Sequence, residues 1–331
     1  MGHGIPEFPA FKLLDIADRD EVERLTRRYP PYSDFNFVSM YCYDTTGDCR
    51  VSLLSGNLVV RFRDYVTLEP FYSFLGTHRV LDTVERLLEQ ANRESIAPML
   101  RLVPATVVEG ANGQLNGLSV SEDPDSADYI IAAHELIELT SGRWRSKRKS
   151  ANRFRRKHPH CAIREMDLAN DITQGQVRGL FETWADKRRK PSSETRNEFA
   201  ALERIMRHSR RFNLLSVGAH LDGRLIGFTI NEAVHAGHYM GHFGKADPDY
   251  AGISVVLESE TAKGMARLGY SQMNYQQDLG LDGLRCYKRS WRPVHCLHKV
   301  TIAGASSRDV TQSTPTAEVA HATCIDEAHA P

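Results

Sequence analysis

The stretch from Asp125 to Pro159 constrains the fold most, because it joins a short strand to a strongly basic helix. The strand is predicted at 128–131, and the helix from about His134 to about Lys157, with Gly142 inside it. Between Arg143 and Lys157 the residues that carry charge are all Lys or Arg. Over this length an α-helix rises about 21 Å. The positive charge is therefore spread along a rod and not gathered at one point.

The basic helix keeps one narrow apolar face. Trp144, Ala151 and Phe154 fall at i, i+7 and i+10, so the helix is anchored on one side and presents cations on the others. One interpretation is a solvated helix whose counter-charges lie elsewhere in the fold. The other is a surface for RNA phosphate, which Trp144 and the Arg and Lys clusters around it favour. The predicted tRNA-binding residues are Arg143, Arg145, Lys147, Arg148, Lys149, Arg153, Arg155, Arg156 and Lys157.

The basic helix differs in charge from the chain as a whole. The 331 residues fit one large or two ordinary domains, and the 42 basic residues balance the 42 acidic ones. Overall charge therefore does not predict nucleic-acid binding. No apolar run approaches the ~18–20 residues needed to cross a bilayer, no secretory signal opens the chain, and the six cysteines lack paired CxxC spacing. We therefore expect a cytoplasmic protein with reduced thiols and no integral membrane segment.

The first half of the chain is predicted to hold strand hairpins and packed helices. In order, the predicted elements are a charged helix after Asp18, hairpin strands at Val51–Leu54 and Leu58–Arg63, an amphipathic helix at 78–95, a strand at Leu100–Pro104 and a turn-rich connection at 107–120.

The second half gives a clearer pattern. Its strongest signal is a hairpin around Asp222-Gly223, because this pair tolerates positive φ. The predicted elements are helices at Gln174–Lys187 and Glu198–His208, strands at Leu214–His220, Arg224–Val234 and His238–Gly244, a helix at Ser254–Leu268, and strands at Gln272–Gln276 and Leu297–Ile302.

This element order is similar to that of GNAT-type acyltransferases, and the first half carries a weaker version of it. We therefore predict an α+β fold with tandem GNAT-like (acyl-CoA N-acyltransferase-like) domains joined by a long basic helix. The predicted boundaries are 1–133 for an N-terminal GNAT-like domain, 134–158 for the connecting helix, 159–303 for a C-terminal catalytic domain and 304–331 for a disordered tail.

The densest group of polar and aromatic residues lies between Tyr275 and Pro293. A strand that ends at Asp278 opens into a Gly-hinged loop, which places a carboxylate and cations at the rim of a sheet. Arg285 and Lys288 are three residues apart, so on a helix they face the same way. Their chemistry suits a phosphate or carboxylate group. The alternative is a structural Asp278–Arg285 ion pair that holds the loop.

Four motifs of the chain resemble one known family. They are Asp128-Tyr129, the Leu136-to-Phe154 run (Leu-x-x-Leu-x-Ser-Gly-Arg, then Ser-Lys-Arg and Asn-Arg-Phe), the Asp222-to-Glu232 hairpin and the Gln277-to-Lys288 loop. Together they resemble the C-terminal, cytosolic domain of phosphatidylglycerol lysyltransferases, a tandem-GNAT fold akin to the Fem-type peptidoglycan aminoacyltransferases. The similarity runs from about Phe11 to about Ile302.

The resemblance implies transfer of an amino acid from aminoacyl-tRNA to a hydroxyl or amine. It implies catalytic roles for Glu232, Asp278, Arg285 and Lys288, and a tRNA surface on the basic helix. Lys288 and Arg285 would bind the tRNA 3′ end or the developing oxyanion, and Asp278 or Glu232 would bind the α-ammonium or take a proton. The predicted substrate-binding residues are Tyr239, His242, Gln277 and Trp291.

The ester of aminoacyl-tRNA is already activated, so the predicted reaction needs aminoacyl-tRNA as co-substrate and no cofactor. The lipid-modifying members of the family carry an N-terminal membrane domain, which this sequence lacks. The predicted acceptor is therefore a small soluble molecule, as in relatives that act in natural-product biosynthesis. Peripheral membrane contact and a phospholipid head group as acceptor remain alternatives.

Two further alternatives concern the donor. A CoA-dependent N-acetyltransferase shares the fold, but such enzymes hold pyrophosphate on a Gly-rich turn at a helix N-terminus. The matching turn at 245–254 contains one glycine and two acids, which would repel it. A non-catalytic tRNA-binding protein is the last alternative, and the presence of Asp278, Arg285 and Lys288 argues against it.

No metal site is predicted. His235, His238 and His242 lie on one strand and its turn, and His295, Cys296 and His298 lie on the last one, but neither group shows the spacing typical of metal ligands.

Overall fold

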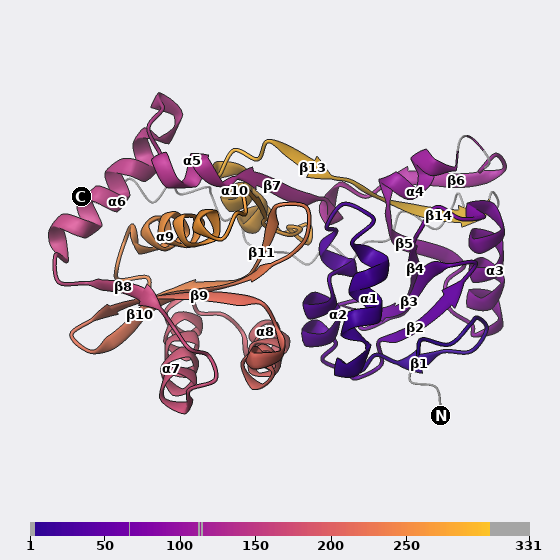
Figure 1. The fold of residues 1–331 in the computed structure, drawn as a ribbon, viewed down its shortest axis with the longest axis horizontal. Helices are drawn as coiled ribbons and strands as arrows, with labels where there is room; N and C mark the ends of the chain where they lie inside the picture. Colours follow the sequence, from indigo (N-terminus) through magenta and orange to yellow (C-terminus); the bar gives the residue numbers. More distant parts are fainter. Residues whose placement is uncertain (1–3, 66, 112, 114, 305–331) are drawn as a thin grey trace. The chain divides into compact units, whose positions relative to one another are not determined.

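The computed structural model describes residues 4–65, 67–111, 113 and 115–304. The chain forms two compact units. The first takes in the described residues up to Asp128, Gln277–Tyr287 and those from Cys296 onward; the second takes in Tyr129–Gln276 and Lys288–His295. Each unit contains a mixed sheet covered by helices (Figure 1). The predicted α+β class is therefore confirmed.

The first sheet has the order β1-β2-β3-β4-β5-β14-β6. Its strands are β1 Lys12–Leu13, β2 Arg50–Leu54, β3 Asn57–Arg63, β4 Pro70–Leu75, β5 Met99–Pro104, β14 Lys299–Gly304 and β6 Leu118–Glu122. Its helices are α1 Arg19–Thr26, α2 Phe37–Tyr43, α3 Val80–Arg93 and α4 Ala105–Gly110. Val80, Val84 and Leu87 of α3 lie on one side of that helix and are buried against the sheet, as the 78–95 pattern predicts.

The second sheet has the order β13-β7-β12-β11-β10-β9-β8. Its strands are β13 His295–Leu297, β7 Asp128–Ala132, β12 Gln272–Asn274, β11 His238–Ala246, β10 Arg224–Ala233, β9 Leu214–Leu221 and β8 Ala162–Glu165. Its helices are α5 Ala133–Glu138, α6 Arg145–Lys157, α7 Asp171–Lys187, α8 Ser192–Arg207 and α9 Ile253–Arg267, with α10 Asp282–Ser290 crossing the division of units after Tyr287. Helix α9 covers one face of this sheet and α7 the other (Figure 1).

The predicted hairpin in the second unit forms as expected. Asp222 and Gly223 both have positive φ, at 50° and 78°, and β9 and β10 pair antiparallel on either side of them. The turn residues therefore fix the register of β9 against β10.

The sheets do not follow the domain boundaries 1–133 and 159–303. Strand β14 lies between β5 and β6 of the first sheet, although it was expected in the C-terminal domain. Strand β7 pairs with β12 of the second sheet, although it was expected to close the N-terminal domain. The turn-rich connection predicted at 107–120 is also wrong in part, because residues 118–120 belong to β6, and β6 pairs with β14. In all three cases, β14, β7 and β6, the sheet position depends on pairing with a strand that is distant in the sequence. The hydrophobic pattern of a short segment does not predict such pairing.

The predicted continuous helix at 134–157 is broken, and it packs within the second unit instead of standing as a separate connector. Helix α5 ends at Glu138, and the next residue, Leu139, has a φ of 47°. A short 3₁₀ turn at Gly142–Trp144 then precedes α6. The guanidinium of Arg148 donates to the carbonyls of Leu139 and Thr140, which the end of α5 leaves without helical partners. The apolar face is confirmed, since Trp144, Ala151 and Phe154 are buried in the core of this unit.

The predicted tail at 304–331 begins one residue too early. Gly304 is the last residue of β14 and pairs with Leu118, so it is part of the sheet. The rest of that segment, 305–331, lies outside the described residues.

Candidate active site

Strands β11 and β12 pair over only a short distance and then separate. Their parallel register runs from His238↔Gln272 to Met240↔Asn274. Past this point a side chain spans the gap, because the Gln276 amide nitrogen donates to the carbonyl of Gly241 over 2.8 Å. Where two neighbouring strands separate, backbone and side-chain groups of both strands face the same gap. This makes it the natural location for a site in the second unit.

A bulge in β11 places His242 next to this split. Ile230 pairs with Phe243 and Asn231 with Gly241, so His242 is the extra residue on its strand. Bulges bend a strand and re-aim a side chain, and they are frequent next to active sites. The His242 side chain is thereby directed to Glu232, with 3.1 Å between Nε2 and the nearer carboxylate oxygen.

Glu232 and His242 form a buried pair. Glu232 is 2% exposed and His242 is 7% exposed. The Gln276 amide nitrogen lies 3.4 Å from His242 Nδ1. An amide nitrogen only donates, so we assign the imidazole proton to Nε2, where it is donated to Glu232. The structure thus brings together one predicted catalytic residue and one predicted substrate-binding residue.

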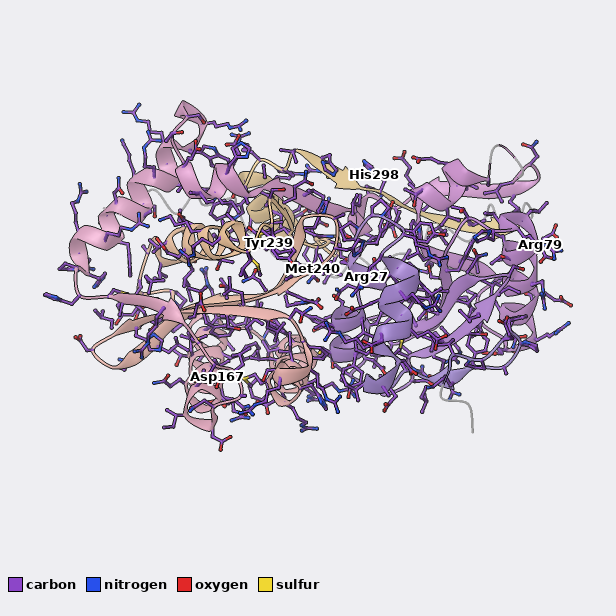
Figure 2. All side chains as sticks on the ribbon, viewed as in Figure 1. Arg27, Arg79, Asp167, Tyr239, Met240 and His298 are labelled. Carbon is purple, nitrogen blue, oxygen red and sulfur yellow. The ribbon has the colours of Figure 1, made fainter. Side chains whose placement is uncertain are left out.

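Tyr239, Tyr275 and Glu258 form a second cluster in this unit, and two of them were not singled out from the sequence. Glu258 is buried and Tyr275 is partly buried. Tyr239 lies on β11 beside α9 (Figure 2), and it is fully buried. The Tyr275 hydroxyl donates to Glu258 Oε1 over 2.6 Å. Among the described residues, neither Glu258 Oε2 nor the Tyr239 hydroxyl has a hydrogen-bond partner. Two polar groups therefore lie unsatisfied in the interior near the strand split.

Burial raises the pKa of Glu258 from 4.5 to about 7, against the smaller lowering effects of the Tyr275 hydrogen bond and the charge of Lys147. Burial also raises the pKa of Tyr239, and the charge of Glu258 raises it further. A sequence signal for Glu258 exists. With Val255, Ala262 and Met265 it falls at i, i+3, i+7 and i+10, on the apolar side of α9. An acid at such a position is buried, and so has a shifted pKa.

The raised pKa of Glu258 predicts a pH-dependent loss of stability. Its folded-state pKa lies above its unfolded value, so its contribution favours folding at low pH and is lost as pH rises from about 4.5 through about 7. We expect Glu258→Gln to match the wild type near pH 5 and to exceed it at pH 8 by up to about 3 kcal/mol in free energy of unfolding.

Urea unfolding of both proteins across this pH range measures the difference. Burial lowers the pKa of His220, which is buried, and of His238, which is partly buried. Both histidines act with the opposite sign, but they do so in both proteins and cancel. Glu260→Gln, on the same helix but only partly buried, serves as control and should show no such trend. A constant difference between the Glu258 variant and the wild type would contradict the prediction.

Lys288 is held at the same strand end as Tyr275. Its ammonium donates to the Tyr275 carbonyl over 2.6 Å and lies 5.6 Å from the centre of the Tyr275 ring. Lys288 is 7% exposed, so a positive charge is fixed in a largely water-excluded position. Such a charge interacts strongly with an anion that forms nearby.

Trp291 lies in the core of the second unit. It is 1% exposed, its ring centre lies 6.3 Å from that of Trp144, and the Lys147 ammonium lies 3.8 Å from it. This placement makes Trp291 a packing partner of the basic helix. A substrate could reach it only if this core opened.

Asp278 and Arg285, in the first unit, form the ion pair that the sequence offered as a structural alternative. Arg285 donates to both Asp278 oxygens, over 2.9 and 3.1 Å, and also to Asp125. The Gly280 amide donates to Asp278 as well, over 2.9 Å. Asp278 is fully buried. Its hydrogen bonds raise the pKa of Arg285, burial opposes them, and the charge of Asp278 and the contact with Asp125 raise the pKa further. Both carboxylate oxygens are engaged in holding the loop.

Gln277 also lies in the first unit, where its amide nitrogen donates to Asp34 over 3.3 Å. The predicted site residues therefore divide between the units. Glu232, Tyr239, His242, Lys288 and Trp291 are in the second, and Asp278, Arg285 and Gln277 are in the first.

The basic helix has counter-charges for part of its length only. Arg143 pairs with Glu135, and Arg155 with Glu260 at 3.4 Å. Lys147 donates to the Ser290 hydroxyl over 2.9 Å. Within the described part of the chain, five of its exposed cations have no ion-pair partner: Arg145, Lys149, Arg153, Arg156 and Lys157. The interpretation that the counter-charges lie elsewhere in the fold thus applies to Arg143, just before α6, and to Arg155.

The turn before α9 is closed to a pyrophosphate. A methyl group added at Gly252, whose φ is 92°, would lie 2.5 Å from the Ser150 carbonyl oxygen, so the backbone of α6 packs directly against this turn. Two carboxylates of the turn, Asp247 and Asp249, are both held by Lys187. A CoA-dependent enzyme would bind its anionic group here. The geometry argues against that alternative.

Within the described residues no helix is long and apolar enough to span a bilayer. In the same part of the chain, no group of three or more His, Cys, Asp or Glu side chains is placed to hold a metal ion.

A family model described as "Phosphatidylglycerol lysyltransferase, C-terminal" matches residues 26–303. The chain belongs to this family. No curated protein sequence matches it. Family membership and the GNAT-like fold make the protein an acyltransferase.

Two solved structures share the fold. A conserved protein of unknown function from Bacteroides thetaiotaomicron has a TM-score of 0.78 at 22% identity, covering 89% of this chain and 99% of that one. The L-PGS of Bacillus licheniformis has a TM-score of 0.60 at 12% identity, covering 95% of this chain and 96% of that one. At these identities the likeness concerns the fold, and it confirms the predicted tandem GNAT-like architecture.

Proposed function

We propose that this family member is an aminoacyltransferase that moves an amino acid from charged tRNA to a hydroxyl or amine of a small soluble acceptor. The observation that carries the proposal is Lys288, a buried ammonium fixed on the Tyr275 carbonyl beside the β11–β12 split. Attack on an ester carbonyl builds negative charge on its oxygen, and a preorganised cation stabilises that charge most where water is excluded.

The remaining groups have supporting roles in this proposal. The Glu232–His242 pair is the proton acceptor for the attacking group, because the Asp278 oxygens are already used by Arg285 and Gly280. Asp278 and Arg285 hold the loop that leads into α10, the helix that carries Lys288. They are positioning residues for the ammonium. No cofactor enters the reaction, since the tRNA ester supplies the activated acyl group.

The acceptor in this proposal needs a nucleophilic hydroxyl or amine and no lipid chain. Small molecules of the kind modified in natural-product pathways meet that need. Phosphatidylglycerol, which the family description names, is the rival acceptor. A panel of aminoacyl-tRNAs, each radiolabelled on the amino acid, tests the proposal. Label should pass from one tRNA to a soluble product in a small-molecule extract, and passage to phosphatidylglycerol vesicles would favour the lipid instead. No transfer from any charged tRNA would refute the proposal.

The uncompensated cations of α6 make a separate prediction about tRNA binding. Replacing Arg145, Arg153 and Arg156 by glutamine should weaken binding and lower the slope of log K against log salt by about 2, because each lost phosphate contact removes roughly 0.7–0.9. Filter binding or fluorescence anisotropy at several salt concentrations measures this slope.

A control variant removes the same number of positive charges from the surface of the first unit. Arg24, Arg79 and Arg93 are exposed arginines of the first unit, and Arg79 projects at the start of α3 (Figure 2). Their replacement by glutamine should leave the slope unchanged. Equal slopes in the α6 variant and the wild type would show that this helix faces another partner.

A further inference from the structure

An open cavity of about 470 Å³ lies in the first unit, within the size range of small-molecule sites. One wall comes from β2 and β3, another from the C-terminal end of α3, and a third from the segment before β1. The lining residues are Pro9, Phe11, Asp48, Arg50, Arg61, Arg63, Gln90 and Glu94. None of them belongs to the candidate active site.

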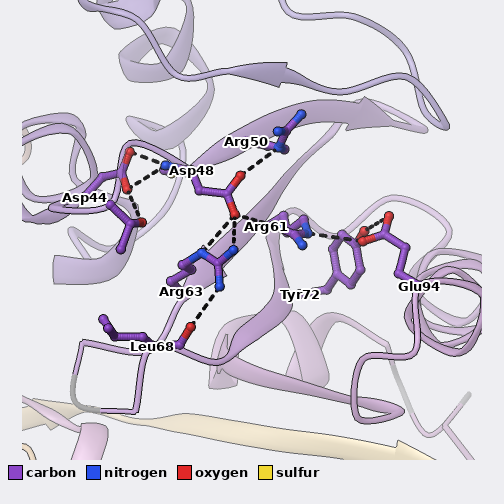
Figure 3. Close-up of polar contacts among 10 residues, drawn as sticks. Asp44, Asp48, Arg50, Arg61, Arg63, Leu68, Tyr72 and Glu94 are labelled. Atoms are coloured by element: carbon purple, nitrogen blue, oxygen red, sulfur yellow. Dashed lines mark hydrogen bonds and ion pairs between the residues drawn. The ribbon is translucent and has the colours of Figure 1, made fainter.

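Asp48 gathers three guanidinium groups at this cavity (Figure 3). Arg50 Nε lies 3.0 Å from one oxygen of Asp48, while Arg61 Nη1 at 2.8 Å and Arg63 Nε at 2.9 Å donate to the other. The strands explain the convergence. Arg61 and Arg63 are two apart on β3 and share a face, and Arg50 on β2 is the register partner of Arg61.

Asp48 and its three arginines are further fixed by two residues that do not line the cavity, Asp44 and Leu68. Asp44 accepts the amide hydrogens of Asp48 and Cys49, over 3.0 and 3.1 Å, and fixes the turn before β2. Arg63 Nη1 donates to the Leu68 carbonyl over 3.0 Å. The guanidinium groups are therefore positioned before any ligand arrives.

The residues that line the cavity include more basic than acidic side chains. Three arginines face two carboxylates, Asp48 and Glu94. Glu94 accepts from Arg61 Nε over 3.2 Å and from the Tyr72 hydroxyl over 2.7 Å. Burial raises the pKa of Asp48, but its bonds to Arg50 and Arg61 outweigh this and lower it overall. Burial raises the pKa of Glu94 as well, but the hydrogen bonds from Tyr72 and Gln90 and the charge of Arg61 lower it overall. Among the residues that line the cavity, three arginines therefore face two ionised acids, while a third acidic residue, Asp44, holds the turn behind Asp48.

Arg50 carries the unused donors. Only its Nε is bonded, to Asp48, and neither of its Nη groups has a hydrogen-bond partner among the described residues. Its side chain is 42% exposed and lines the cavity. A free guanidinium fork matches the paired oxygens of a phosphate or carboxylate group.

Two apolar residues also line the cavity. Phe11 and Pro9 line it, and the Phe11 ring packs on Tyr72 with 5.7 Å between ring centres. We propose that this cavity binds a small molecule that carries one phosphate or carboxylate group on an apolar or planar body. The anionic group lies against Arg50 and Arg63, and the body lies against Phe11. This inference is independent of the tRNA-dependent reaction.

Calorimetric titration of the full chain tests it with named probes. Phenyl phosphate and benzoate each pair an anion with a ring, and benzyl alcohol is the neutral counterpart. We expect at least one of the two anions to bind, and benzyl alcohol not to bind. Binding of phenyl phosphate alone assigns a phosphate ligand, and binding of benzoate alone assigns a carboxylate.

Variants locate the binding. Arg50→Gln should reduce affinity for the anion roughly tenfold to a hundredfold, with thermal unfolding unchanged because Arg61 and Arg63 still hold Asp48. Arg63→Gln should reduce it as well. Arg79→Gln, an exposed arginine of the same unit that does not line the cavity, should bind as the wild type does. The inference is overturned if neither anion binds at millimolar concentration, if benzyl alcohol binds equally well, or if Arg50→Gln binds unchanged.

Discussion

Replacing Lys299 by methionine is expected to lower the free energy of unfolding of the first unit by about 3–5 kcal/mol, because it leaves two buried carboxylates without a cation. Lys299 is 1% exposed, and its ammonium lies 2.9 Å from Asp128 and pairs with Asp34. Burial alone would lower the pKa of Lys299, but Asp128 and Asp34 outweigh it and raise the pKa overall.

The pH dependence of this loss gives a sharper test. Burial already raises the pKa of Asp34 in the native protein, although the charge of Lys299 opposes it. Without that cation, the folded-state pKa of the acid rises further above its unfolded value. Stability is then lost as pH rises, so Lys299→Met should be less destabilised at pH 5 than at pH 8.

Urea unfolding followed by circular dichroism measures both effects. Lys263→Met is the matched control, because Lys263 is partly exposed and pairs with Glu260 within one helix turn. It should cost less than about 1 kcal/mol. If Lys299→Met were as stable as this control, the buried cluster would contribute nothing to the fold.

Lys288→Ala is expected to reduce single-turnover transfer from the cognate aminoacyl-tRNA by roughly 10²–10³-fold, the loss typical of removing one group that stabilises an oxyanion. The reason is that the ammonium is fixed before reaction by the Tyr275 carbonyl and largely shielded from water. Because the substitution also frees a buried carbonyl, thermal unfolding must be measured beside the rate.

The control for Lys288 is its neighbour on α10. Arg289 is exposed, so Arg289→Ala should keep a near-normal rate while removing the same charge. A folded Lys288→Ala protein that transfers as fast as the wild type would contradict the assignment. If tRNA binding is retained while transfer is lost, the ammonium acts on the reaction; if binding is lost too, it acts on the tRNA end.

Local pattern predicted many of the elements in both units. The apolar spacing of α3 and α9, the Asp222-Gly223 turn and the burial of Trp144, Ala151 and Phe154 all follow from short-range periodicity and turn chemistry. For the motif at Gln277–Lys288 the sequence offered a structural alternative, the Asp278–Arg285 ion pair, and the loop contains this pair.

The sequence by itself determined the order and type of most elements, the apolar and basic faces of the helix at 145–157, and membership of one acyltransferase family. Only the tertiary structure decided that β14 belongs to the first sheet and β7 to the second, that the Tyr275 hydroxyl donates to Glu258, and that three arginines converge on Asp48. The physical reason is range. A helix or turn is specified by residues a few positions apart, whereas β14 and β7 pair with strands that are distant in the sequence. The contacts of Asp48 and Glu258 are shorter in range, but they depend on the direction in which each side chain leaves its strand or helix, which the residue pattern does not specify.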